Sequence, residues 1–155
     1  MKLKPSLVLY WLIAGVVLGL SVSQFASGTG NAFLVSQPHI WATLVLIGLG
    51  LYLATLPIYR YRLKVEKQIK PAPKRPNPFL AFRLLVLARA VILTAAGFTG
   101  WHLGQLLWLI SFSVSPAALV LPTTLGLGAS VVTLVFGLLA DFNCRLPKDS
   151  SGEVA

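Results

Sequence analysis

Ionisable side chains are scarce in this sequence, and their spacing limits the chemistry that they could do. The 155 residues include four acids, Glu66, Asp141, Asp149 and Glu153, together with two histidines and a single cysteine, Cys144. One cysteine cannot form an internal disulfide or a Cys-x-x-Cys metal site. No glycine-rich stretch has the spacing of a phosphate-binding loop. We therefore expect no enzyme activity, no cofactor and no bound metal.

Arg89 and Asp141 are placed so that they could meet within a membrane. The third apolar stretch is expected to begin at Pro78, with Asn77 as its N-cap. Arg89 would then lie about 15 Å along that helix. A charge at the centre of a span costs about 2.5–3.5 kcal/mol by insertion scales. Asp141 ends the next apolar stretch, an antiparallel neighbour, so an Arg89–Asp141 ion pair is one interpretation. In the other, Arg89 extends to lipid phosphates and Asp141 is solvated.

His102 is the ionisable group in the outer half of an apolar stretch, and Gln105 lies three residues further on. Residues three apart share one face of a helix. A histidine at such a position could relay protons or bind a ligand. Without a nearby acid, it is more often a polar contact between helices. We therefore expect His102 and Gln105 to make polar contacts inside the membrane.

Four long apolar stretches must position these residues. Hydrophobic residues make up 56% of the chain and charged residues 11%, whereas a typical soluble domain has about 25% charged residues. An uncharged run of about 20 residues suits a helix that crosses roughly 30 Å of hydrocarbon. The sequence therefore predicts an all-α integral membrane protein, a single domain over residues 1–155, with transmembrane helices at about 7–25, 40–59, 84–110 and 117–140.

The first stretch has an alternative interpretation as a cleaved signal peptide. Lysines precede it and small residues follow its apolar part, as in such peptides. Its apolar run of about 19 residues is longer than the usual signal-peptide core of roughly 7–15 residues. We therefore favour a retained transmembrane helix.

The segment of residues 60–83 holds eight of the thirteen lysines and arginines. Because basic residues in short loops stay on the cytoplasmic side, we expect this loop, the amino terminus and the tail of residues 141–155 to be cytoplasmic in an inner (plasma) membrane. This bias also explains the net charge of +9 without nucleic-acid binding, which we do not expect. Residues 59–66 combine strand-like alternation with helical i,i+4 charge pairs. We favour a continued helix because an isolated strand has no pairing partner.

The basic loop is also a candidate surface for anionic lipid headgroups. A basic residue near such a surface contributes about 1 kcal/mol of attraction. The residues expected to make these contacts are Arg60, Arg62, Lys64, Lys67, Lys70, Lys74 and Arg75.

Small residues recur at helical spacing in the first and third apolar stretches. Gly15 and Gly19 form a GxxxG motif, and Ala96, Gly100 and Gly104 form a second ridge. Small residues allow helix backbones to approach closely in a membrane. We expect both ridges to pack against other helices, and they could support a homo- or hetero-oligomer.

Three motifs in the second half of the chain can be compared with known families: RPNPFLAFRLLVLARA, GWHLG and DFNCRLP. They resemble the bacterial membrane-protein family called domain of unknown function 3180, whereas the first half matches that family in hydropathy only. The resemblance implies a four-helix membrane protein and assigns no activity. This chain has arginine at position 89 where the family has lysine, aspartate at 141 where it has glutamate, and histidine at 102 where tyrosine is usual.

Two classes of function fit these observations. The leading hypothesis is a non-enzymatic scaffold or accessory subunit, suggested by the small-residue ridges and by the lack of a reactive set of side chains. The alternative is an oligomeric transporter or permease-like module for a small anionic metabolite, which the basic inner face would attract.

Overall fold

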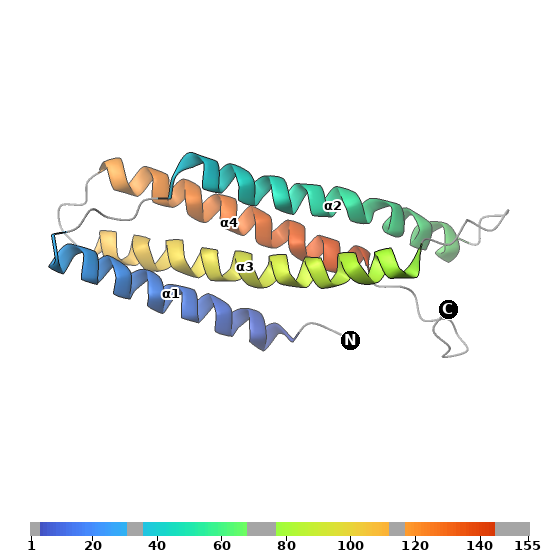
Figure 1. Ribbon diagram of the computed structural model, residues 1–155, viewed down its shortest axis with the longest axis horizontal. Coiled ribbons are helices and arrows are strands. Elements are labelled where there is room, and N and C mark those ends of the chain that lie inside the picture. Colours follow the sequence, from blue (N-terminus) through green and yellow to red (C-terminus); the bar gives the residue numbers. More distant parts are fainter. Residues whose placement is uncertain (1–3, 31–35, 68–76, 112–116, 145–155) are drawn as a thin grey trace.

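A computed structural model describes residues 4–30, 36–67, 77–111 and 117–144, which form four helices (Figure 1). These described residues contain no strand, and each helix is long and apolar enough to cross a membrane. The all-α architecture with four candidate spans is therefore confirmed. The helices are α1 (Pro5–Gly28), α2 (Pro38–Glu66), α3 (Pro78–Ile110) and α4 (Ala117–Asn143).

The first three helices begin where the sequence favours a helix start. Pro5, Pro38 and Pro78 each occupy the first helical position, where the missing N–H leaves no hydrogen bond unmade. Asn77 caps α3, because its side-chain oxygen accepts a hydrogen bond from Phe79 N at 3.0 Å. The predicted start of this helix is therefore confirmed.

The connection between α2 and α3 is shorter than the expected loop of residues 60–83. The second helix continues to Glu66, and the third begins at Pro78. Residues 59–66 are thus helical rather than strand-like. A helix satisfies its own backbone hydrogen bonds, whereas a lone strand would leave its N–H and C=O groups without partners.

The central helix of the bundle is α3. In Figure 1, α1 and α3 run in one direction, while α2 and α4 run in the other. The first helix packs on α3 alone, whereas α4 lies against both α3 and α2. Side chains on the inward face of α3 are therefore buried. Four of them have no exposed area: Ala88, Ile92, Ala95 and Ala96.

The inward faces of α2 and α4 differ in character. On α4 the buried positions carry small or short polar residues at spacings of three or four: Thr123, Gly126, Ser130, Thr133, Gly137 and Ala140. On α2 they carry mainly larger apolar residues: Leu44, Gly48, Leu51, Thr55 and Ile58. The small side chains of α4 let neighbouring helices approach closely. In a membrane, where no hydrophobic effect drives helices together, this close packing favours their association.

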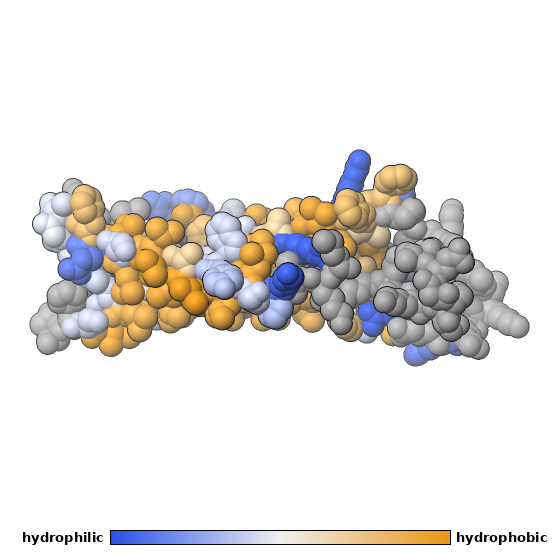
Figure 2. Space-filling model, turned by 90° about the horizontal axis from the view of Figure 1, so that it is seen from below, coloured by the Kyte–Doolittle hydropathy of each residue, from blue (hydrophilic) through white to orange (hydrophobic). Residues whose placement is uncertain are grey.

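Large apolar side chains cover much of the outside of the bundle. Tyr10 is 69% exposed, Leu46 is 64% exposed and Phe82 is 65% exposed. Figure 2 shows a continuous group of apolar residues on one face, between its left end and its centre. Such a surface is unusual for a soluble monomer and suits a lipid environment.

Candidate functional site

The GxxxG motif of α1 lies directly on α3. A Cβ atom added to Gly15 would collide with Gly97 O and would stand 3.1 Å from Gly100 Cα. A Cβ atom added to Gly19 would collide with Trp101 O. Only glycine therefore fits at these two positions of α1 at this separation of the helices.

The α3 side of this contact is equally tight. A Cβ atom at Gly100 would collide with Leu12 O, and one at Gly104 would collide with Val16 O. Ala96, the third member of the expected ridge, is fully buried. The small residues of α1 and α3 thus contact each other within one chain, so a partner protein would have to meet other surfaces.

A hydrogen bond fixes the relative register of these two parallel helices. Trp108 donates from Nε1 to Gln24 Oε1 at 3.0 Å, which joins positions 84 residues apart in the sequence. The same offset places Lys4, just before α1, at the level of Ala88 on α3. The amino-terminal part of α3, before residue 88, therefore extends beyond the start of α1.

Arg89 and Asp141 are brought together by the packing of α3 on α4. Arg89 Nε lies 3.4 Å from Asp141 Oδ1. The arginine side chain is 24% exposed and the aspartate side chain only 3%. A carboxylate at this depth needs a nearby cation, because desolvation of an unpaired charge is costly.

Cys144 lies just after α4 and packs with Ile58 of α2 and Ala81 of α3. Burial, and then the negative charge of Asp141, raise the pKa of the Cys144 thiol to about 11. The thiol is thus protonated at neutral pH, which makes it a weak nucleophile.

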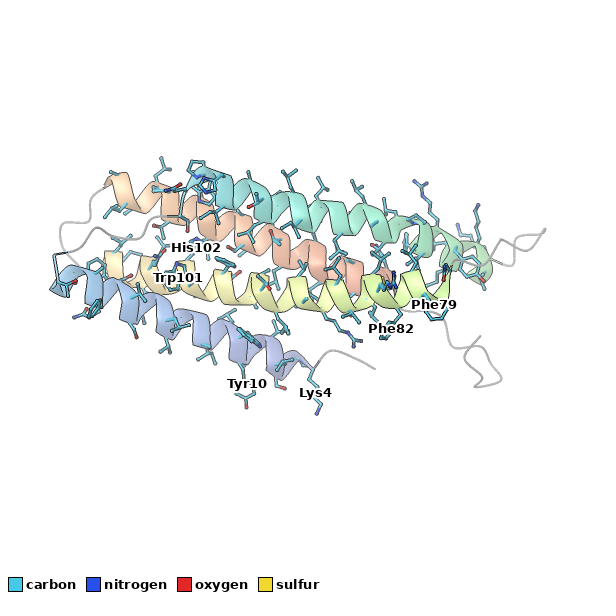
Figure 3. All side chains as sticks on the ribbon, viewed as in Figure 1. Lys4, Tyr10, Phe79, Phe82, Trp101 and His102 are labelled. Carbon is cyan, nitrogen blue, oxygen red and sulfur yellow. The ribbon has the colours of Figure 1, made fainter. Side chains whose placement is uncertain are left out.

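His102 is fully buried and joins three parts of the chain (Figure 3). Its Nε2 lies 2.7 Å from Ser36 Oγ, in the segment before α2. Its Nδ1 lies 2.8 Å from Phe98 O and 3.2 Å from Ser130 Oγ of α4. Glycine at position 126 makes room for the ring, because a Cβ atom there would stand 2.5 Å from His102 Nε2.

A neutral imidazole satisfies this arrangement. With the proton on Nδ1, His102 donates to Phe98 O while Nε2 accepts from the Ser36 hydroxyl. Ser130 donates its own proton to Gly126 O at 2.8 Å and can therefore accept from Nδ1. The contacts of His102 thus hold α3, α4 and the start of α2 together. Gln105, on the same helix, is also buried.

Polar contacts between α2 and α4 were not anticipated from the sequence. Asn143 donates from Nδ2 to Thr55 Oγ1 at 3.1 Å, and both side chains are buried. Arg62 donates to Phe142 O at 3.3 Å and places its guanidinium 4.7 Å from the centroid of the Phe142 ring. The missed signal was the recurrence of short polar residues, such as Thr55 and Ser130, at the inward spacing of each helix.

The predicted lipid-contacting residues have different positions. Arg60, Lys64 and Lys67 are exposed at the carboxyl end of α2, whereas Arg62 contacts α4 as described above. The remaining three, Lys70, Lys74 and Arg75, lie outside the described residues, as does the tail from residue 145. We call the end of the bundle that carries the start of α3 and the carboxyl ends of α2 and α4 the basic end.

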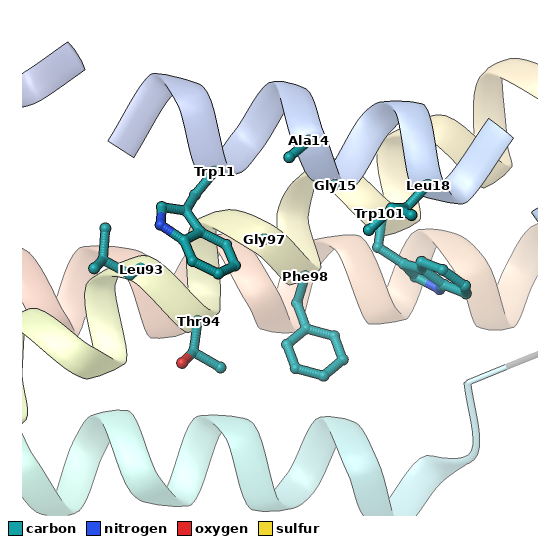
Figure 4. A pocket seen from close by; sticks show the side chains of 9 residues that line it. All are labelled: Trp11, Ala14, Gly15, Leu18, Leu93, Thr94, Gly97, Phe98 and Trp101. Carbon is teal, nitrogen blue, oxygen red and sulfur yellow. The ribbon is translucent and has the colours of Figure 1, made fainter. Parts of the chain in front are cut away.

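A groove of about 290 Å³ lies along the contact between α1 and α3 (Figure 4). Trp11 and Trp101 stand toward its two ends, and Gly97, which has no side chain, lies between them. Its lining is apolar apart from Thr94. Such a groove suits a hydrocarbon group rather than a polar ligand.

Residues 7–148 match the family described as "Protein of unknown function (DUF3180)". This match covers most of the chain. Neither a curated protein nor a solved structure matches the chain. Within the described residues, no three His, Cys, Asp or Glu side chains are grouped so that they could hold a metal ion.

Proposed function

We propose, from the premise that the chain belongs to the DUF3180 family, that it is a multi-pass membrane protein acting as a non-enzymatic scaffold or accessory subunit. In this proposal the protein lies in a bacterial inner (plasma) membrane. Its basic end and both termini face the cytoplasm, because basic residues near span ends favour that side.

The hydrogen bonds of the buried polar side chains support this proposal. His102 bonds to Ser36, Phe98 and Ser130, and Asn143 bonds to Thr55. Apart from the His102–Phe98 bond, which lies within α3, each of these contacts joins separate elements of the bundle. In a membrane, such hydrogen bonds and close small-residue contacts supply helix association. The polar residues are therefore explained by holding helices together, a structural role.

The partner-binding surface in this proposal is the outward apolar side of the bundle. The small-residue ridges are already covered by the contact between α1 and α3. Exposed apolar side chains on α4, such as Val131, Val135 and Leu138, remain available to another membrane helix.

The topology can be tested by the accessibility of introduced cysteines. A cysteine introduced near Lys67 should react with a membrane-impermeant maleimide only in inside-out vesicles, and one at Gly28 only in right-side-out vesicles. The opposite pattern at both positions would overturn the orientation, and reaction of both in either vesicle type would overturn the four-span arrangement.

The scaffold role can be tested by crosslinking in native membranes followed by purification in mild detergent. We expect a defined complex with a second membrane protein that is lost on a charged substitution such as Val135→Glu. The matched substitution Leu46→Glu on α2 controls for insertion. Recovery of a monomer alone, under conditions that preserve other membrane complexes, would contradict the proposal.

The alternative, a transporter of a small anionic metabolite, is favoured by the exposed cations at the basic end. The fully buried positions along α3, including Ile92 and Ala95, leave its interface with α4 closely packed. A path for a polar solute would therefore run between copies of the chain. Uptake of anions by proteoliposomes, measured against empty liposomes, would support the transporter over the scaffold.

A further inference from the structure

Beyond the start of α1, a stripe of α3 is not covered by any other helix that the structure describes. The first helix covers α3 at Gly97, Gly100 and Gly104. At spacings of three or four residues, the same face of α3 runs back through Ala90, Val86, Phe82 and Phe79. All four side chains are exposed, with Phe79 77%, Phe82 65% and Val86 50% exposed. This uncovered stripe, which consists of Phe79, Phe82, Val86 and Ala90, is continuous with an interface that α1 already uses.

The uncovered stripe exists because α1 starts too late to reach it. The hydrogen bond from Trp108 to Gln24 sets an offset of 84 residues, which places Lys4 at the axial level of Ala88. The segment from Phe79 to Ala88 therefore extends about 14 Å beyond the start of α1. Figure 3 shows Lys4, Phe82 and Phe79 on the same side of the bundle, with α1 ending before it reaches the two phenylalanines.

The apolar part of α2 extends alongside the uncovered stripe, toward the basic end. Arg89 pairs with Asp141, and Asn143, two residues further along α4, bonds to Thr55. Thr55 is therefore about 3 Å closer to the basic end than Arg89, and α2 stays uncharged for four more residues before Arg60. The apolar part of α2 thus extends about 10 Å beyond the level at which α1 begins. We call the space beside Phe79, Phe82 and Val86 that α1 does not reach the notch under α1. In a membrane, this notch would lie where the headgroups meet the hydrocarbon.

Among the residues that the structure describes, the exposed charges beside this notch have one sign. Lys4 is exposed at the start of α1, and Arg83 is exposed beside the stripe. The nearest described acid on α4, Asp141, is buried against Arg89. A ligand of the notch should therefore combine an apolar part, which contacts Phe79 and Phe82, with an anionic part, which pairs with Lys4 and Arg83.

The groove between α1 and α3 lengthens this surface away from the basic end. Leu93, Thr94 and Gly97 line the groove and are the next turns of the same stripe after Ala90. From Val86 to Gly97 the distance along the helix is about 16 Å. This is close to half of the roughly 30 Å hydrocarbon thickness, and hence to the depth of one leaflet.

We infer that the notch under α1 binds one anionic phospholipid from the leaflet at the basic end. Its headgroup lies between Lys4 and Arg83, and one acyl chain follows the stripe past Val86 and Ala90 into the groove at Gly97. The inference rests on the proposed membrane-spanning arrangement but not on which side of the membrane the basic end faces. It adds a defined lipid site to the general headgroup attraction of the basic loop.

The test uses the purified full-length chain in phosphatidylcholine vesicles that contain a trace of phosphatidylglycerol with a photoreactive acyl chain. After irradiation, labelled residues are located by peptide mass spectrometry. We expect label concentrated on residues 86–98 and on Trp11. Unlabelled phosphatidylglycerol should compete for this label, and added phosphatidylcholine should not.

Matched variants separate the acyl groove from the headgroup site. Gly97→Leu fills the groove, and its Cβ is tolerated because the nearest atom, Trp11 Cε3, would stand 3.8 Å away. The same change at Gly50 or Gly128, where no atom lies within 4 Å of an added Cβ, is the control. We expect Gly97→Leu to remove label from residues 86–98 and the two controls to retain it.

The headgroup site is tested by removing its cations. Lys4→Gln and Arg83→Gln should each weaken competition by phosphatidylglycerol about fivefold, the factor for roughly 1 kcal/mol per basic residue. The paired control, Lys64→Gln with Lys67→Gln, removes two exposed cations from α2 at the same end of the bundle. It should leave the label on the stripe unchanged.

The outcomes distinguish this inference from the proposed function. Equal labelling of the stripe and of the outward face of α2 at Leu46 and Ile47 would show general lipid contact and overturn the specific site. Absence of label everywhere would show that the chain does not enter the bilayer and would overturn the membrane proposal itself. Protection of the stripe by another polypeptide in native membranes would identify a protein occupant and overturn the lipid assignment.

Discussion

Arg89 and Asp141 face each other on α3 and α4, with 3.4 Å between Arg89 Nε and Asp141 Oδ1. The pair lies where α1 begins, so it marks the level at which the bundle changes from four helices to three. Because the carboxylate is 3% exposed, the cation compensates for much of the cost of its burial.

Neutralising Arg89 alone should therefore destabilise the bundle. We expect Arg89→Met to lower the free energy of unfolding by about 3 kcal/mol or more, since it leaves a charge in a buried position. The double variant Arg89→Met with Asp141→Leu should recover most of this loss. Unfolding in mixed detergent micelles, titrated with sodium dodecyl sulfate, measures both. Additive losses in the double variant would show that the pair is not coupled.

A single methyl group at Gly100 should separate α1 from α3. The added Cβ of Gly100→Ala would collide with Leu12 O and stand 2.9 Å from Val16 N, both backbone atoms. We expect a loss of about 1–3 kcal/mol, as for other overpacked sites. Gly50→Ala is the control and should stay within about 0.5 kcal/mol of the wild type. The same unfolding titration measures the stability of both variants. Equal stability of Gly100→Ala and Gly50→Ala would contradict the close contact between α1 and α3.

Adding a methyl group at Gly126 should release the segment before α2. The Cβ of Gly126→Ala would stand 2.5 Å from His102 Nε2, so the ring must move away from Ser36. Loss of this buried hydrogen bond should cost about 1–3 kcal/mol. Hydrogen–deuterium exchange should rise at residues 36–44 in this variant but not in Gly128→Ala. If exchange rises in both variants, or in neither, His102 does not hold the segment before α2 in place.

Cys144 should react slowly with thiol reagents until the pH is very high. Because its pKa is raised to about 11 from 9.0, the thiolate fraction near pH 8 falls about 100-fold relative to an unperturbed thiol. The rate of maleimide labelling should keep rising with pH through about 11. Asp141→Asn removes a negative charge that raises the pKa, so it should shift the profile to lower pH. A Cys144→Ser chain with cysteine in place of Lys64 supplies the exposed reference, and identical profiles would refute the shift.

The helices and their order follow from local patterns that the sequence displays directly. Four uncharged runs, prolines at helix starts and the Asn77 cap act through nearby residues only, so they can be recognised without knowing the fold. The helical continuation to Glu66 likewise depends on i,i+4 neighbours and on the lack of a partner strand. The basic segment of residues 60–83 includes helical residues at both ends, because charge marks a membrane boundary rather than the end of a helix.

Pairings across the bundle depend on register, which local patterns do not contain. An antiparallel arrangement made an Arg89–Asp141 pair conceivable but left lipid contact and solvation open as alternatives. Two partners of His102, Ser36 and Ser130, come from other segments, and Ser36 belongs to a connection with no periodic pattern. Thr55 lies at the inward spacing of α2, but local pattern does not show that its partner is Asn143 at the end of α4.

By itself, the sequence determined an all-helical chain with four candidate spans, two small-residue ridges and a concentration of basic residues between the second and third helices. Only the tertiary structure decided that the two ridges meet each other and that Arg89 lies beside Asp141. It also decided that α1 begins at the level of residue 88 of α3 and does not cover Phe79, Phe82 and Val86. The physical reason is that hydropathy and helix capping are properties of neighbouring residues. The axial offset between two helices is instead set by side-chain interlocking across the whole contact, here by glycines against backbone and by Trp108 on Gln24.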